Sequence, residues 1–186
     1  MQINWESLGV SEESNFVQLF FDPHSETLVA HFNKDIGQGY GLKSLWARHI
    51  DEPRYSKLTP TNGGLSYEDP VLSPISAHVF TNVLEVQSRN NGYDGYDWHS
   101  VQRIDLLTGE IEELVKNGEI DVEPPFVKAW VSTLHGVSHD AKTLHCSITH
   151  QRSAGAEDAD TDYYLSKYHM DESRFEPITK LAGTFL

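Results

Sequence analysis

Three segments of the chain resemble one another closely enough to be treated as internal repeats. They read FDPHSETL at residues 21–28, LSPISAHV at 72–79 and VSHDAKTL at 137–144. Each contains an apolar residue, a small polar or acidic residue, a turn of about four residues and a β-prone residue, which indicates a strand, a tight turn and a returning strand. Repeats constrain the fold strongly, because each one is expected to form one supersecondary unit.

The similarity continues beyond each turn at nearly constant spacing. Roughly 30 residues after the turn, an extended segment ends in an apolar residue followed by aspartate, at Asp51, Asp105 and Asp171. A further short strand is expected after each of these, at 55–58, 110–114 and 175–178. The pattern therefore predicts three units of four antiparallel strands each.

Helical periodicity is nearly absent from the chain, because Gly, Pro or strand-like alternation interrupts every longer window. Four-stranded units repeated every 50 to 65 residues or so are typical of β-propeller blades. We expect a single all-β domain over residues 1–186. Its blades are expected at about 14–59, 66–116 and 127–181.

Residues 137–144, together with the segment DPVLSP at 69–74, resemble the repeat of TolB-type β-propellers, which are themselves WD40-like. In that family a Ser-Pro-Asp-Gly-Lys-apolar turn joins the first two strands of a blade. The glycine position is Ser25, Ser76 and Ala141 here, and because a Cβ atom disfavours the left-handed conformation, we expect turns of another type. The resemblance implies a fold but no single function, since such propellers act as binding platforms, peptidase gates, lyases and scaffolds.

Three blades are too few to close a ring, because propellers typically close with four to eight. An open arc would leave the outer faces of the first and last blades exposed, with apolar residues such as Phe20, Phe32 and Trp130. We therefore expect a homodimer in which two chains complete a six-bladed ring about a two-fold axis. The alternatives are an irregular sandwich of three blades, or a chain that is part of a longer propeller.

Charge limits the partners of this chain. Lys and Arg total 14 against 28 Asp and Glu, a formal net charge of -14 at pH 7. Such a surface repels phosphate, so we expect neither nucleic acid nor a membrane as partner. The sequence shows no apolar run near the roughly 18 residues of a transmembrane helix, and residues 1–14 do not resemble a signal peptide, so we expect a cytoplasmic location.

The single cysteine, Cys146, excludes an internal disulfide and an all-cysteine metal site. It lies in the apolar alternation Leu144, Cys146, Ile148, which indicates a small core residue.

The longest polar insertions fall between the second and third strands of each unit, at 33–41, 88–98 and 152–162. Equivalent hairpin loops of a propeller emerge on one face, where function usually lies. These loops would display the acidic residues Asp35, Asp94, Asp97, Glu157, Asp158, Asp160 and Asp162. An acidic rim favours a cationic ligand, a metal ion or a basic partner, and simple solvated hairpin tips are the alternative.

The second insertion contains an unusual aromatic cluster of Tyr93, Tyr96 and Trp98, separated by Gly and Asp. Aromatic faces on a glycine-jointed loop could stack on a sugar ring or surround a cation. They could equally fold down to cap their own blade.

Ten histidines require a metal site to be considered. In the repeat alignment Gln18, Asp69 and His135 fall near one another on the innermost strands, which line the channel of a propeller. Oligogalacturonate lyases are propellers that hold a metal through channel-facing histidines, and residues 135–138 loosely resemble that context. However, no H-E-x-x-H or comparable spacing is present, and zinc or manganese needs three or more ligands. We therefore assign no metal and no cofactor.

No nucleophile elbow, phosphate loop or dinucleotide fingerprint is present. We therefore expect a non-enzymatic binding or scaffold protein that uses the acidic loop face or the channel mouth to bind a small molecule, a carbohydrate or a protein. The residues expected to bind the ligand are Tyr93, Tyr96, Trp98, Asp69 and His135. The alternative is a metal-assisted carbohydrate-active enzyme, a lyase or hydrolase, with His135 and Asp69 at the channel.

Overall fold

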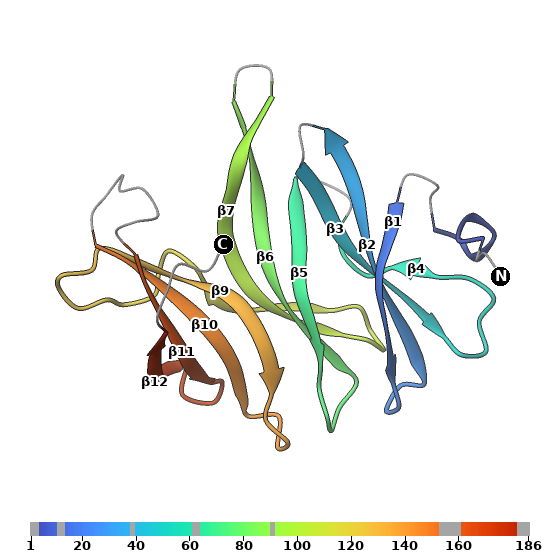
Figure 1. The fold of residues 1–186 in the computed structure, drawn as a ribbon. Coiled ribbons are helices and arrows are strands. Elements are labelled where there is room, and N and C mark those ends of the chain that lie inside the picture. The colour runs from blue at the N-terminus through green and yellow to red at the C-terminus, as the bar shows by residue number, and fades with distance from the viewer. Residues whose placement is uncertain are drawn as a thin grey trace.

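Three antiparallel sheets of four strands follow one another along the chain (Figure 1). The structure is a computed structural model that describes residues 4–10, 14–37, 40–60, 64–89, 92–152 and 161–181. The prediction of an all-β fold built from three four-stranded units is confirmed. Within these ranges no helix has the length and hydrophobicity needed to cross a bilayer.

Each sheet is a meander in which neighbouring strands are also consecutive in the chain. The first sheet consists of β1 (Ser14–Asp22), β2 (Thr27–Gly37), β3 (Tyr40–His49) and β4 (Ser56–Lys57). The second consists of β5 (Leu65–Leu72), β6 (His78–Arg89), β7 (Gly92–Asp105) and β8 (Ile111–Lys116). The third consists of β9 (Lys128–Val137), β10 (Thr143–Gln151), β11 (Thr161–His169) and β12 (Arg174–Leu181).

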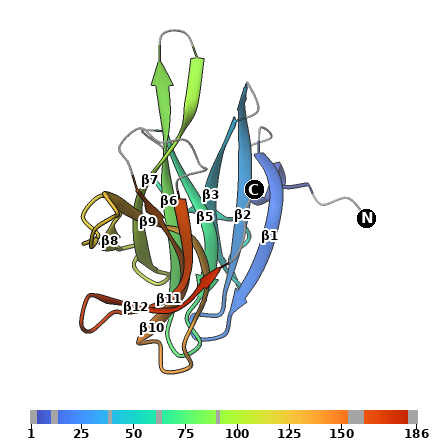
Figure 2. The ribbon, with the colours of Figure 1, turned by 60° about the vertical axis from the view of Figure 1, so that its left-hand side comes forward.

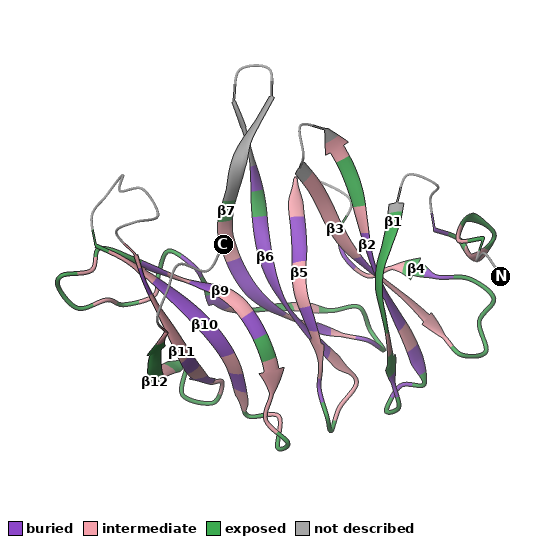
Figure 3. Ribbon diagram, in the orientation of Figure 1, coloured by how far each residue is buried: buried purple, intermediate pink, exposed green. Residues whose placement is uncertain are grey.

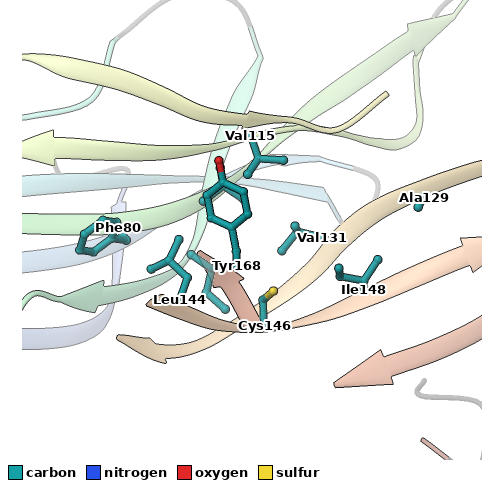
Figure 4. Close-up of a cluster of buried hydrophobic side chains, with 10 residues drawn as sticks. Phe80, Val115, Ala129, Val131, Leu144, Cys146, Ile148 and Tyr168 are labelled. Carbon is teal, nitrogen blue, oxygen red and sulfur yellow. The ribbon is translucent and has the colours of Figure 1, made fainter. Parts of the chain in front are cut away.

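The second and third sheets pack face to face through a continuous apolar cluster (Figure 4). Phe80 and Val115 of the second sheet meet Leu144, Cys146 and Tyr168 of the third. The Tyr168 hydroxyl crosses the interface and donates a 2.8 Å hydrogen bond to the carbonyl of Leu114. Cys146 is 1% exposed, which confirms it as a core residue, and burial raises the pKa of its thiol to about 12.

The first and second sheets meet where β3 lies beside β5 (Figure 1). Val29 and Leu45 pack there with Tyr67 in a second apolar cluster. Buried His31 donates from Nε2 to the Tyr67 carbonyl at 2.9 Å, and burial is the main cause that lowers the pKa of this histidine. The seam therefore combines apolar burial with one hydrogen bond from a buried imidazole, whose Nδ1 has no partner among the described residues.

The outer face of the first sheet is partly covered by the N-terminal segment 4–10, which contains the short 3-10 helix η1 (Glu6–Leu8). The Trp5 ring stacks on Phe16 at 5.0 Å between centroids and meets Phe32 edge-on at 5.1 Å. Phe32 is 0% exposed. The prediction that Phe32 is exposed is therefore wrong, because Trp5 and its neighbours cover it.

Two of the three repeat turns adopt the left-handed backbone that their Cβ atoms disfavour. Ala141 has a φ of 53°, so the expectation of another turn type is wrong for the third repeat. In the first repeat the left-handed residue is Glu26, with a φ of 51°, one position after Ser25. The Asp22 carboxylate accepts a 2.8 Å bond from the N–H of Ser25 and so stabilises that turn.

Candidate functional site

The second predicted loop, 88–98, is a long two-stranded ribbon. β6 continues to Arg89 and β7 begins at Gly92, so the prediction of a glycine-jointed loop is wrong. The first predicted loop, 33–41, is likewise mostly strand, because β2 runs to Gly37 and β3 starts at Tyr40. Aromatic residues favour strands, which explains why the cluster continues β7.

Of the three aromatic residues of the ribbon, only Trp98 has a side chain that the structure describes. Tyr93, Tyr96 and Trp98 all lie on β7, paired in register with β6. The side chains of Tyr93 and Tyr96 lie outside the described residues. Trp98 is half-buried and reaches a groove on the third sheet.

Asp162, which the sequence predicted on the acidic rim, is not a free carboxylate in the structure. Asp162 is 9% exposed and pairs with Lys180 Nζ at 2.8 Å and with Arg152. The hydrogen bond from Lys180 is the largest cause that lowers the pKa of Asp162. Asp35 and Asp97 are exposed. The side chain of Asp94, and the whole of Glu157, Asp158 and Asp160, lie outside the described residues.

A groove of about 680 Å³ lies on the outer face of the third sheet, which points away from the second sheet. It includes Trp98 and His135, two of the five predicted ligand residues. The remaining walls come from all four strands of the sheet: Trp130, Ser132, Thr133, Ser147, Thr149, Tyr163, Leu165 and Leu181.

Two β-bulges on β9 shape the floor of this groove. Ser132 and His135 have no partner of their own in the pairing of β9 with β10. Each extra residue shifts the alternation of side chains by one, and bulges commonly re-aim side chains beside functional sites. As a result Trp130, Thr133 and His135 all line the groove, while Val131 and Leu134 face the core.

The polar side chains that line the described part of the groove carry hydroxyl groups and one imidazole. His135 Nε2 lies 2.7 Å from Ser147 Oγ, and Ser132 Oγ donates to the Ser147 carbonyl at 3.2 Å. Thr149 is 2% exposed, and among the described residues its Oγ1 has no hydrogen-bond partner. Because a buried hydroxyl without a partner costs about 1–3 kcal/mol, Thr149 is the group that a ligand could satisfy.

Three aromatic side chains, together with Leu165 and Leu181, supply apolar surface to the groove. The aromatic residues are Trp98, Trp130 and Tyr163. The Lys128 ammonium lies 5.6 Å from the Trp130 ring centroid and holds that ring by a cation–π contact. A concave surface of aromatic rings with a few placed hydroxyls is typical of small-ligand sites.

Asp69 lies next to the groove, on the other side of β9. It occupies a bulge of β5 with a φ of 48°, and its carboxylate accepts a bond from the N–H of Leu134. Burial and then Glu68 raise the pKa of Asp69, against the opposing effects of Leu134 and the nearby His135. The structure thus places Asp69 within electrostatic range of His135, whereas Gln18 is exposed on β1.

These residues do not fit a metal centre. Among the described residues no group of three or more His, Cys, Asp or Glu is arranged to hold a metal ion. Asp69 and His135 form only a pair, and the Asp69 carboxylate already binds a backbone N–H. No reaction step through a metal follows from this site.

A second cavity, of about 630 Å³, lies between β8, the segment after it and the inner face of the third sheet. Its walls carry charges of both signs, including Lys116, Asp121 and Arg174. Asp69, Trp98 and His135, the predicted ligand residues whose side chains are described, do not line it. Each space contains a buried polar atom without a partner among the described residues, Thr149 Oγ1 in the groove and His150 Nδ1 in the cavity. The outer groove is the better candidate because Trp98 and His135, two of the predicted residues, line it.

Comparisons with known proteins bear on the fold alone. No family model matches the chain, and no curated protein matches it. A GH74 xyloglucanase from Xanthomonas campestris aligns with a TM-score of 0.52 and 10% identity, over 88% of this chain and 21% of the enzyme. The similarity supports three propeller blades, since the xyloglucanase is a propeller enzyme.

Two oligogalacturonate lyases also align, one in complex with manganese and one from Vibrio parahaemolyticus. Both have a TM-score of 0.46, with 13% and 14% identity, over 90% of this chain and 47% of each lyase. The chain therefore spans about a fifth of the xyloglucanase and about half of each lyase.

Proposed function

We propose that this protein is a propeller-type binding module whose groove on the third sheet takes an uncharged carbohydrate. The observation that carries the proposal is the lining of the groove. Three aromatic rings, Trp98, Trp130 and Tyr163, stand beside hydroxyl groups, and the described residues that line the groove include no Asp, Glu, Lys or Arg. A sugar ring offers the matching chemistry, an apolar face for the rings and hydroxyls for the polar groups.

The negative charge of the chain favours neutral carbohydrates over acidic ones. With a net charge of -14 the chain repels polyanions, and the described lining of the groove includes no Lys or Arg, the ammonium of Lys128 being held beside it on the Trp130 ring. A neutral oligosaccharide is therefore favoured over an oligogalacturonate.

The Thr149 hydroxyl supports the same class of ligand. A site built to hydrogen-bond a substrate hydroxyl discriminates strongly against analogues that lack it, because the buried group would stay unpaired. Thr149 Oγ1 is such a group within the described part of the chain.

Tryptophan fluorescence and calorimetry test the proposal together. Two of the four tryptophans line the groove, so a neutral β-glucan oligosaccharide should change the emission, whereas an oligogalacturonate of equal length should not. Trp130→Ala should abolish binding. Trp46→Ala, which changes a tryptophan of the first sheet, is the matched control and should bind normally. Normal binding by a folded Trp130→Ala variant would contradict the proposal.

The metal-assisted carbohydrate-active enzyme is the weaker hypothesis, because the described residues offer only Asp69 and His135 as ligands. A thermal shift with manganese that His135→Ala removes would favour it. The specific kinship with TolB-type or WD40-like propellers and the cytoplasmic location stay predictions.

A further inference from the structure

Ser147 and His135 form a hydrogen-bonded pair on the floor of the groove. The pair belongs to the third sheet, which forms one end of the molecule and comes forward in Figure 2. His135 Nε2 lies 2.7 Å from Ser147 Oγ. Ser147 is 8% exposed and lies in the middle of β10, which Figure 3 shows as buried. A hydroxyl within about 2.6–3.2 Å of an imidazole is the contact that activates a serine nucleophile, so the pair meets the first geometric requirement of acyl transfer.

The bulge that directs His135 into the groove is anchored from the second sheet. The Asp69 carboxylate on β5 accepts a bond from the N–H of Leu134, the residue before His135. Asp69 has a φ of 48°, and residues strained in this way cluster where a site needs a fixed geometry. The Asp69 charge also lies within electrostatic range of His135. Asp69 therefore holds the strand that presents the imidazole, and its charge favours the imidazolium that forms when His135 takes a proton.

Strand register places a polar and an apolar neighbour on either side of Ser147. Thr133 of β9 and Leu165 of β11 are its partners in the two pairings of β10. All three residues line the groove, and directly opposite side chains on one face of a sheet lie about 4.5–5.5 Å apart between Cβ atoms. An ester carbonyl at Ser147 would therefore find a hydroxyl donor for its oxygen at Thr133 and an apolar contact for a short acyl chain at Leu165.

The next row of residues on the same face is aromatic. Trp130 and Tyr163 pair with Thr149, which lies two residues along β10 from Ser147. Two residues of a strand span roughly 7 Å, which is on the scale of one sugar ring. An acyl group carried by a sugar that packs on Trp130 and Tyr163 would thus reach the Ser147 hydroxyl.

We propose that Ser147 and His135 are the nucleophile and the general base of an esterase site, which removes short acyl groups from a carbohydrate. The acyl-transfer chemistry is argued from the pair itself, whereas the carbohydrate part of the substrate rests on the proposed function. Glycoside hydrolysis ordinarily uses two carboxylic acids, and the described lining of the groove contains no Asp or Glu. An O-acyl ester of a neutral sugar is uncharged and matches this lining.

The reaction proceeds through an acyl-enzyme. His135 Nε2 takes the proton of the Ser147 hydroxyl while Oγ forms a bond to the ester carbonyl carbon. The bond from that carbon to the sugar oxygen then breaks, and the proton on Nε2 passes to the leaving oxygen. Water attacks the acyl-serine with His135 again as the base, which releases the carboxylic acid and restores the Ser147 hydroxyl. Water is the one co-reactant that the balance needs.

A fluorophosphonate probe and p-nitrophenyl acetate test the proposal on the whole chain. The probe should label Ser147, as identified by peptide mass spectrometry, and the ester should be hydrolysed. Ser147→Ala and His135→Ala should each remain folded by circular dichroism and lose about 100-fold or more in hydrolysis, the contribution of a positioned base. Ser76→Ala is the matched control and should keep full activity. The Ser76 hydroxyl also lies close to a histidine, 2.9 Å from His78 Nδ1, but on a turn outside the groove.

Asp69 acts through the bulge and through its charge, so it is a positioning residue with its own readout. Asp69→Asn keeps an oxygen acceptor for the N–H of Leu134 and removes the charge. The variant should therefore lower kcat for p-nitrophenyl acetate and leave KM unchanged, a split that general loss of structure would not produce.

Absence of labelling at Ser147, or hydrolysis that survives in a folded Ser147→Ala variant, would overturn the proposal. Tryptophan fluorescence with an unacylated β-glucan oligosaccharide separates this result from failure of the proposed function. Oligosaccharide binding without labelling would contradict the esterase alone. Labelling and ester hydrolysis without oligosaccharide binding would support the Ser147 and His135 site and contradict the carbohydrate assignment.

Discussion

Thr149→Val should stabilise the protein and weaken its binding at the same time. The Thr149 side chain is 2% exposed, and its hydroxyl has no partner among the described residues. An unsatisfied buried hydroxyl costs about 1–3 kcal/mol, and valine keeps the branched shape without that group. Taking the lower end, we expect a gain of about 1 kcal/mol in the free energy of unfolding, or roughly 2–4 °C in Tm for a chain of this size.

The same substitution removes a hydrogen bond that the ligand is proposed to make. A neutral hydrogen bond contributes about 0.5–1.5 kcal/mol, so the affinity for a neutral oligosaccharide should fall roughly two- to twelvefold. Urea unfolding and calorimetry on one preparation measure both effects.

Ser147→Ala provides the contrast. The Ser147 hydroxyl lies 2.7 Å from His135 Nε2, so its removal breaks an existing bond and should cost about 1 kcal/mol of stability. A Thr149→Val protein that is less stable than the wild type would refute the reasoning, since it would mean that the hydroxyl already has a partner.

Tyr168→Phe should lower stability by about 1 kcal/mol in urea unfolding, because it removes the hydrogen bond to the carbonyl of half-buried Leu114 at the seam between sheets. Ala141→Gly should raise it by roughly 0.5–1 kcal/mol, because glycine relieves the left-handed φ of 53°; a lower Tm would contradict this. Cys146, with a thiol pKa of about 12, should react with a disulfide reagent only after unfolding. Burial lowers the pKa of His31, so as pH falls through about 6.5 the unfolded chain takes up a proton that the native state resists. The urea midpoint should therefore fall between pH 7.5 and 5.5, and less so in His31→Gln.

The fold could be predicted from the repeats, because each turn motif lies between two β-prone stretches. The periodicity of two places Leu144, Cys146 and Ile148 on one face of β10, and the structure buries them together. Nothing in those local patterns indicates that segment 4–10 returns to cover Phe32, because that contact joins residues far apart in the sequence.

The groove was predictable only in part. Trp98 and His135 were identified from aromatic clustering and from the repeat alignment. Ser147 and Thr149 alternate with the core residues of β10, a pattern that could have assigned them to the outer face. The bulges at Ser132 and His135 leave no local signal in the sequence, and without them the side chains of β9 would be placed on the wrong faces.

The most direct test of the groove is to map backbone amide shifts by NMR while a neutral oligosaccharide is added to the labelled protein. We predict that the perturbed amides cluster on β9, β10 and β11 and around Trp98, with little change on β1 or in the cavity beside β8. Perturbations centred on that other cavity, or none at millimolar oligosaccharide, would contradict the assignment of the groove as the binding site.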